Sequence, residues 1–137
     1  MSDKVCLDSN ILVYLFSDDE PEKQQTARKL VHGSLCLTGI NTLNEMNSVL
    51  VRKKKLSFLK TRLALDYVIR DMEIEFIRLT TLRETLHIME RYGYSDFDSL
   101  VIAVALGSNC KMLYTEDMQH GQVLEGRLTI WNPFLSN

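Results

Sequence analysis

The sequence has little of what builds linkers, disulfide frameworks or membrane spans. Its 137 residues include two prolines, six glycines and three cysteines. So few Pro and Gly exclude collagen-like and low-complexity chains. The cysteines are widely spaced and form no CxxC pair, which argues against a structural zinc site. The longest apolar stretch, residues 100–106, is far shorter than the roughly 20 residues that span a bilayer.

The sequence also lacks the marks of export. The N-terminus reads Met1-Ser2-Asp3-Lys4 and is followed by a short apolar run, without the basic segment and long apolar core of a signal peptide. The three cysteines, Cys6, Cys36 and Cys110, all stand in apolar surroundings. We therefore expect reduced core thiols and a cytoplasmic location, with no membrane association.

An excess of charge of either sign is missing as well. The formal net charge is −2, with 45% apolar and 25% charged residues, close to the averages for globular domains. This balance excludes a strongly basic, histone-like coat for nucleic acid. It does not exclude an enzyme that binds nucleic acid through a local patch. The length predicts one domain over residues 1–137.

Short apolar runs alternate with segments of helical periodicity. Strands are expected at residues 5–7, 35–38, 75–79, 111–115 and 128–131, and helices at residues 11–16, 22–31, 42–54, 57–72, 81–92 and 95–106. Strands that are apolar on both faces and alternate with helices indicate a covered parallel sheet. The expected fold is therefore an α/β three-layer sandwich, with a central, mainly parallel sheet of four or five strands flanked by helices.

Acidic residues stand where the strands end and the following helices begin. They are Asp8, Glu45, Asp96, Asp98, Glu116 and Asp117. Each has an ordinary alternative explanation, because Thr42–Glu45 and Ser95–Asp98 fit the capping-box pattern and Asp8 or Asp117 suits a cap. In a parallel sheet, however, all of them crowd one edge.

Carboxylates crowded together raise one another's pKa values, and a cation relieves the repulsion. The ligands here would be oxygens only, which favours Mg²⁺ or Mn²⁺ over zinc. Such a site suits hydrolysis of a phosphodiester, because the metal activates water and stabilises the leaving oxygen.

Four segments, in order, resemble the acidic motifs of PIN-domain ribonucleases. They are Val5-Cys6-Leu7-Asp8-Ser9-Asn10, Asn41-Thr42-Leu43-Asn44-Glu45, Tyr94-Ser95-Asp96-Phe97-Asp98-Ser99 and Leu113-Tyr114-Thr115-Glu116-Asp117. Each motif alone is weakly specific, but the four in this order cover nearly the whole chain. The small size is similar to the VapC branch, the toxins of type II toxin–antitoxin systems.

The resemblance implies roles for individual residues. Asp8, Glu45, Asp98 and Asp117 would be the metal-binding and catalytic acids. Asp98 is preferred to Asp96 because it follows an aromatic residue and precedes a small one, which leaves Asp96 at the rim or as a cap. Glu116 would be secondary, and Asn10 and Thr115 would orient the acids by hydrogen bonds. The implied partners are RNA and a cognate antitoxin, while the sequence leaves open whether two copies form a homodimer.

A segment free of acids offers contacts for the RNA backbone. Residues 46–65 hold Arg52, Lys53, Lys54, Lys55, Lys60 and Arg62. The alternative is a solvated helix end, since cations suit helix C-termini. Tyr92 and Tyr94 could stack on a base, although core packing is the expectation that we favour, and His120 is a weaker candidate for a substrate contact.

Other functions remain open at this point. A phosphatase would need Asp-x-Asp after its first strand, but Asn10 stands at the third position. A phospho-signalling receiver would need a lysine where Thr115-Glu116 stands. A PIN-like nuclease that is not a toxin, in RNA processing, or a non-catalytic interaction module is also compatible with these residues.

Overall fold

Within residues 3–135, the part of the chain that the computed structural model describes, six strands form one sheet in the order β3-β2-β1-β4-β6-β5. The strands are β1 (Lys4–Leu7), β2 (Leu35–Gly39), β3 (Glu73–Glu75), β4 (Met112–Tyr114), β5 (Val123–Leu124) and β6 (Leu128–Trp131). The helices are α1 (Ser9–Phe16), α2 (Pro21–His32), α3 (Ile40–Arg52), α4 (Phe58–Asp71), α5 (Leu79–Tyr92) and α6 (Asp96–Gly107). All pairings are parallel except that of β5 with β6.

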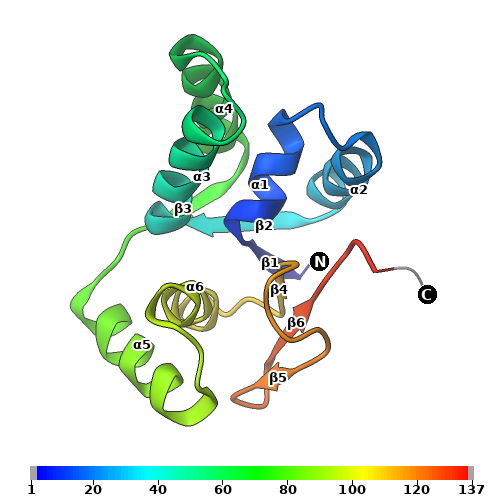
Figure 1. Cartoon of the computed structure of the whole chain (residues 1–137). Helices are drawn as coiled ribbons and strands as arrows, with labels where there is room; N and C mark the ends of the chain where they lie inside the picture. The colour runs from blue at the N-terminus through cyan, green and yellow to red at the C-terminus, as the bar shows by residue number, and fades with distance from the viewer. Residues whose placement is uncertain (1–2, 136–137) are drawn as a thin grey trace.

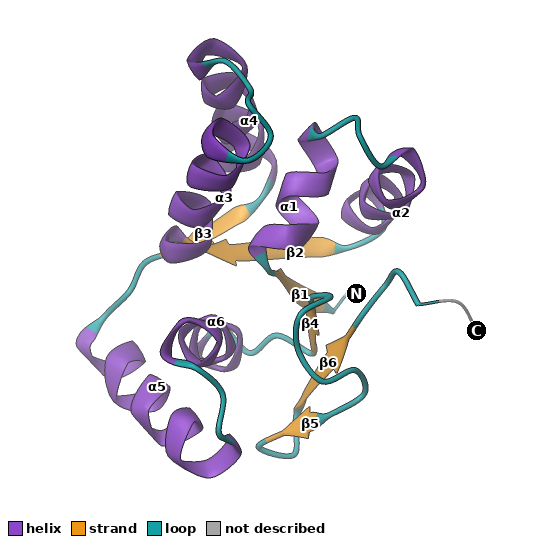
Figure 2. Cartoon of the chain, viewed as in Figure 1, coloured by secondary structure: helices purple, strands orange, loops and turns teal. Residues whose placement is uncertain are grey.

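The helices form a layer on each face of the sheet, as Figures 1 and 2 show. Alternation along β1 explains the two layers, because successive strand residues point to opposite faces. Val5 and Leu7 pack into a core with residues of α1–α4, whereas Cys6 packs into a second core with residues of α5 and α6. The predicted three-layer α/β sandwich is confirmed.

Most boundaries differ from the sequence expectation by one or two residues, and the largest difference lies at the third strand. The third strand was expected at residues 75–79 but occupies Glu73–Glu75, and α5 already begins at Leu79. The apolar Phe76 and Leu79 indicated a buried strand, but both side chains are exposed. The short β5, which pairs with β6 across a hairpin, adds a sixth strand to the four or five predicted.

The three cysteines lie in the core, as the sequence predicts. Cys6, Cys36 and Cys110 are buried free thiols. None of the helices within residues 3–135 combines the length and the apolar character needed to cross a membrane.

The chain order places a crevice at the carboxyl end of β1. From β1 the chain adds β2 and then β3 on one side, and it returns through α5 and α6 to add β4 on the other side. Such a change of direction leaves a crevice at the carboxyl ends of the two strands that flank it, which is where α/β sheets bind ligands. In this chain those strands are β1 and β4, and Asp8 directly follows β1.

Candidate active site

Four acids from four separate segments line one cavity of about 490 Å³. Asp8 follows β1, Glu45 lies on α3, Asp98 lies in the first turn of α6, and Asp117 follows β4. The structure therefore brings together the four residues that the sequence motifs single out, although up to 109 positions separate them along the chain.

Asp8 is the buried member of the four. Its side chain is 5% exposed, and its two oxygens are held separately. Oδ1 accepts a hydrogen bond from the Ser9 amide at 2.8 Å, which caps α1, and Oδ2 accepts one from Thr115 Oγ1 at 2.8 Å. Burial raises the pKa of Asp8 to about 6; the two hydrogen bonds oppose this, while Glu45 and Asp98 add to it.

A small network fixes Asp117 beside Asp8. Asn10 Nδ2 donates to Asp117 Oδ2 at 2.9 Å and to Thr115 Oγ1 at 3.2 Å. The Asp117 amide also donates to Thr115 Oγ1, at 3.2 Å. Asn10 and Thr115 thus connect two of the acids through side-chain hydrogen bonds, with Thr115 fully buried between them.

Glu45 does not have the capping role that the sequence left open. Helix α3 begins at Ile40 with Gly39 as its N-cap, and no side chain caps it. Thr42 is buried inside the first turn, and Glu45 lies further along the helix, so the Thr42–Glu45 capping box is wrong. The exposed carboxylate of Glu45 instead lines the cavity.

The two acids of α6 are separated by the helix. Ser95 caps it, its Oγ accepting from the Asp98 amide at 3.2 Å. Asp98 lines the cavity, whereas Asp96 is exposed and is not among the lining residues. The pKa of Asp98 is raised, first by burial and then by Asp117 and Glu45. The repulsion expected among these carboxylates is therefore present.

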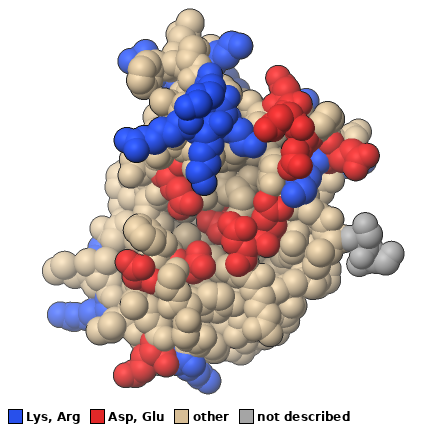
Figure 3. Space-filling model, viewed as in Figure 1, with Lys and Arg blue, Asp and Glu red and all other residues tan. Residues whose placement is uncertain are grey.

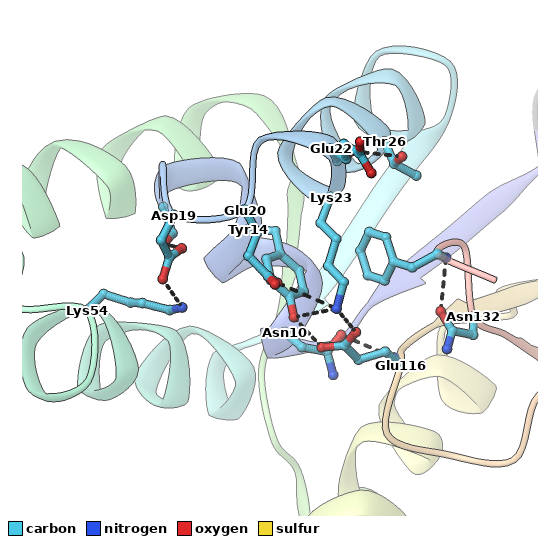
Figure 4. Close-up of polar contacts among 12 residues, drawn as sticks. Asn10, Tyr14, Asp19, Glu20, Glu22, Lys23, Thr26, Lys54, Glu116 and Asn132 are labelled. Carbon is cyan, nitrogen blue, oxygen red and sulfur yellow. Dashed lines mark hydrogen bonds and ion pairs between the residues drawn. The ribbon is translucent and has the colours of Figure 1, made fainter. Parts of the chain in front are cut away.

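Glu116 is paired with a lysine, although it lines a second hollow together with Glu45 and Asp117. Its Oε2 lies 2.9 Å from Lys23 Nζ, and its other oxygen accepts a hydrogen bond from the Tyr14 hydroxyl. Figure 4 shows the three side chains converging from α1, α2 and the end of β4. Lys23 Nζ also lies over the rings of Tyr14 and Phe134, 5.0 and 5.4 Å from their centroids. Glu116 is therefore part of an ion-pair cluster beside the cavity.

The basic segment borders the acidic cavity. Figure 3 shows basic side chains gathered over the α3–α4 end of the molecule and acidic side chains across the middle of the same face. The second hollow, of about 240 Å³, is also lined by Lys53 and Lys54, and it shares Glu45 and Asp117 with the first cavity. The two hollows therefore adjoin, and together they lead from carboxylates to lysines.

The remaining basic residues are placed differently. Arg52, Lys53, Lys55, Lys60 and Arg62 are exposed, whereas Lys54 is half-buried and pairs with Asp19 at 2.8 Å (Figure 4). Lys60 lines a separate hollow with Asp18 and Asp19. Of the six, only Lys53 and Lys54 line the hollow that adjoins the acids.

The aromatic candidates and His120 have structural partners. Tyr92 accepts a hydrogen bond from the Glu125 amide at 2.8 Å, Tyr94 donates to Gln122, and both pack against the α6 core, so the core-packing alternative holds. His120 Nδ1 accepts a hydrogen bond from the Asn132 amide at 2.9 Å, and its ring packs against Trp131 at an interplanar angle of 56°. None of the three lines the acidic cavity.

A second cluster of ligand-type side chains lies elsewhere. Glu84, His87 and Glu125 each place one ligand atom within 4.8 Å of the others. The Glu125 carboxylate already contacts His87 Nε2 at 2.7 Å, Arg91 and the Tyr92 hydroxyl. Its charge is thus balanced within the fold, and the cluster fastens α5 to the β5–β6 hairpin.

The acidic cavity fits a hydrated divalent cation. All its charged lining residues are carboxylates, and Mg²⁺ prefers oxygen ligands while keeping several of its waters. Asp8 and Asp98 have raised pKa values because burial and neighbouring acids disfavour their charge. A cation between the four acids would remove that penalty.

Most of the chain matches a known protein family. The family model of the PIN domain matches residues 5–123, a range that includes all four acids. The chain belongs to the PIN-domain family. No curated protein matches it.

Solved structures share the PIN fold over most of their length. A toxin–antitoxin complex from Klebsiella pneumoniae has a TM-score of 0.72 at 19% identity and covers 95% of this chain and 98% of its own. VapC20 of Mycobacterium tuberculosis, described as a toxin that cleaves the sarcin–ricin loop, has a TM-score of 0.68 at 17% identity, over 82% and 91%. VapBC2 of Rickettsia felis, bound to a promoter DNA fragment, has a TM-score of 0.66 at 18% identity, over 94% and 99%.

The cavity of this PIN domain also contains residues that the sequence motifs did not single out. They are Asn41, Asn44, Ser48, Phe97, Leu100 and Val101. A signal for the first three was present, because positions 41, 44 and 48 share one helical face with Glu45. The sequence gives no comparable sign that Phe97 is exposed, since a phenylalanine beside an apolar helix is usually buried.

Proposed function

We propose that this PIN domain is an Mg²⁺-dependent endoribonuclease that hydrolyses phosphodiester bonds of RNA. The observation that carries the proposal is the convergence of Asp8, Glu45, Asp98 and Asp117 on one cavity at the carboxyl edge of the sheet. A divalent cation bound there, Mg²⁺ or in its place Mn²⁺, would activate water, polarise the phosphoryl group and stabilise the leaving oxygen.

The chain's own residues would act in three ways. The four carboxylates would hold the cation and its waters. Thr115 and Asn10 would keep Asp8 and Asp117 in place through the hydrogen bonds described above. Lys53 and Lys54, in the adjoining hollow, would contact RNA phosphates, with the other basic residues of α3 and α4 extending the positive rim. These contacts position the backbone and leave the bases unread.

The biochemical test compares acids inside and outside the cavity. Purified chain is incubated with single-stranded RNA, with Mg²⁺ or with EDTA. We expect cleavage only with Mg²⁺, and a loss of roughly a hundredfold or more in Asp98→Asn. Asp66→Asn, an exposed acid on α4, is the matched control and should cleave like the wild type. Cleavage that survives EDTA would sink the metal mechanism.

We further propose that the protein is the toxin of a toxin–antitoxin pair and acts in the cytoplasm. The similarity in fold to proteins described as toxins and toxin–antitoxin complexes supports this role. Induction of the chain without its partner should arrest growth of the host, and Asp8→Asn should relieve the arrest. Normal growth with soluble wild-type chain would instead favour an RNA-processing nuclease that is not a toxin.

A further inference from the structure

The cavity that holds the four acids has two unlike walls. Its α3 wall is polar and its α6 wall is apolar. The α3 wall carries Asn41, Asn44 and Ser48, and the α6 wall carries Phe97, Leu100 and Val101. A volume of about 490 Å³ exceeds what a hydrated cation needs and lies within the roughly 300–1,000 Å³ typical of small-molecule sites.

The polar wall follows from the spacing along α3. Residues three and four apart lie on one helical face, so that Asn41, Asn44 and Ser48 line up with Glu45. The buried Leu43, Met46 and Leu50 anchor the helix in the core. Two amides and a hydroxyl therefore stand directly beside a carboxylate of the proposed metal site.

Asn41 contains an unsatisfied polar atom. Its Oδ1 is buried and receives no hydrogen bond from any residue within 3–135. This oxygen has almost no accessible surface, so it is not a contact that the cavity offers to a ligand. It lies against the Gly39 backbone instead, where a Cβ would come within 2.3 Å of it.

The apolar wall has an equally unusual residue. Phe97 directly precedes Asp98 and is 73% exposed. Leu100 and Val101 continue its surface along α6 into the cavity. An exposed aromatic ring next to the acids is a platform on which a planar group can stack.

We infer that this cavity binds an unpaired nucleobase of the RNA next to the scissile phosphate, stacked against Phe97 with its hydrogen-bonding edge toward the exposed Asn44 and Ser48. This rests on the proposed function, since the phosphate is the one held at the four acids. Single-stranded RNA is read by stacking on aromatic side chains and by hydrogen bonds to exposed base edges. A base within a duplex would offer neither a free face nor a free edge to these two walls.

Among occupants of this cavity, a base is favoured over a peptide segment by the order of the features. The stacking ring and the amides adjoin the acids themselves, and Glu45 and Asp98 stand on the same two elements as Asn44 and Phe97. A nucleotide whose phosphate lies at the acids brings its own base to these walls. A peptide bound by a protein partner is the other outcome of the test.

The test measures how fast matched variants cleave an intact RNA and the same RNA lacking one base. The substrates are a single-stranded RNA oligonucleotide and versions in which one nucleotide flanking the cleaved bond, on either side in turn, is abasic. Phe97→Ala is compared with Phe97→Tyr and with the control Phe58→Ala, which removes a ring that is 67% exposed at the start of α4. Asn44→Ala is assayed on an RNA library randomised around the cleavage site.

Phe97→Ala should lower kcat/KM on the intact RNA by roughly 5- to 150-fold, the range expected for one stacked base. Phe58→Ala should stay near the wild type, and Phe97→Tyr, which keeps an aromatic ring, should lose much less than Phe97→Ala. On the RNA that is abasic at the recognised position, wild type and Phe97→Ala should cleave at equal rates. Asn44→Ala should change which bases flank the cleavage sites. Equal loss of rate on intact and abasic RNA, or no loss in Phe97→Ala, would overturn the inference.

Measurements of RNA binding test the base subsite separately from the proposed cleavage activity. Fluorescence anisotropy measures the affinity of EDTA-treated chain for the same dye-labelled RNA, intact and abasic. If wild type binds and Phe97→Ala binds less tightly on intact RNA only, the base subsite stands even when nothing is cleaved. Failure of cleavage alone then counts against the nuclease. If Phe97→Ala changes neither the cleavage of RNA nor its binding but weakens capture of a co-expressed antitoxin, the cavity serves a protein partner and the inference is wrong.

Discussion

Thr115 Oγ1 donates a hydrogen bond to Asp8 Oδ2 at 2.8 Å, between residues that are 107 positions apart in the chain. The contact joins the carboxyl ends of the neighbouring strands β1 and β4, where Leu7 pairs with Tyr114. The same hydroxyl oxygen accepts hydrogen bonds from the Asp117 amide and from Asn10 Nδ2. One buried side chain thus sets the positions of two of the four acids.

Replacing Thr115 by valine keeps the shape and removes these bonds. We expect RNA cleavage to fall roughly 10- to 100-fold, the effect typical of groups that orient metal ligands, while Thr115→Ser retains most of the activity. The hydrogen bond also lowers the pKa of Asp8. The pH profile of cleavage should therefore shift upward in Thr115→Val. An unchanged profile in a folded variant would contradict the positioning role.

Asp8 should make the metal-free protein less stable as the pH rises. The pKa of Asp8 is about 6 in the folded chain, above its ordinary value of 3.8. Between these pH values the folded state therefore binds one more proton than the unfolded state. Stability is therefore lost as the pH rises from about 4 to 6, by about 3 kcal/mol at most.

Thermal unfolding in EDTA at pH 4 and pH 7.5 measures this loss. Asp8→Asn should be more stable than the wild type at pH 7.5 and equal to it at pH 4. Adding Mg²⁺ should stabilise the wild type at pH 7.5 and have little effect on Asp8→Asn. A difference between the two proteins that does not depend on pH would refute the raised pKa of Asp8.

The acids of α6 should differ sharply in their effect. Asp98 lines the cavity and Asp96 does not, although both lie in the first turn of the helix. Asp98→Asn should lose roughly a hundredfold or more in cleavage rate, whereas Asp96→Asn should retain most of it. Equal losses, measured on the same RNA at the same Mg²⁺ concentration, would mean that the assignment of Asp98 is wrong.

The pair of Lys23 and Glu116 should contribute to stability more than to chemistry. Lys23→Met keeps the apolar stem against Tyr14 and Phe134 and removes the charge. We expect a loss of about 1 kcal/mol in unfolding free energy, because both members are only partly shielded from water. A double-mutant cycle with Glu116→Gln measures the coupling. Additive effects of the two substitutions would show that the contact contributes nothing.

Lys53 should make a phosphate contact that Arg62 does not. Lys53 lines the hollow beside the acids, while Arg62 is exposed on α4. Lys53→Ala should weaken RNA binding and reduce the salt slope of the binding constant by about 1. Arg62→Ala should have a smaller effect on both quantities. Anisotropy titrations at several salt concentrations measure both quantities. A larger effect of Arg62→Ala than of Lys53→Ala would contradict this prediction.

The sequence predicts the fold well where periodicity and burial agree. The apolar runs that became β1, β2 and β4 pack on both faces, whereas β6 packs one face into the α6 core. Helix α6 is buried nearly all round, as its composition indicates. The prediction for residues 75–79 failed because Phe76 and Leu79 are exposed. Their apolar character indicated a buried strand that the segment does not form. The two-residue β5 is too short to give a pattern at all.

The candidate site was predictable to a similar extent. The positions of Asp8, Glu45, Asp98 and Asp117 follow from strand order, because parallel strands present their carboxyl ends together. The partners of the acids do not follow in the same way. That Lys23 would pair with Glu116, and that Lys54 would pair with Asp19, depends on how α1, α2 and α3 pack. Such contacts between distant segments leave no trace in local spacing.

The central claim is that the four acids hold a divalent cation with which the chain cleaves RNA. Its most direct test is the cleavage rate of single-stranded RNA by EDTA-stripped protein as Mg²⁺ is added, with the ends of the products identified. We expect no cleavage without the cation, a rate that rises and saturates with Mg²⁺, and products that carry a 5′-phosphate and a 3′-hydroxyl. Cleavage in EDTA, or products that end in a cyclic phosphate, would contradict it.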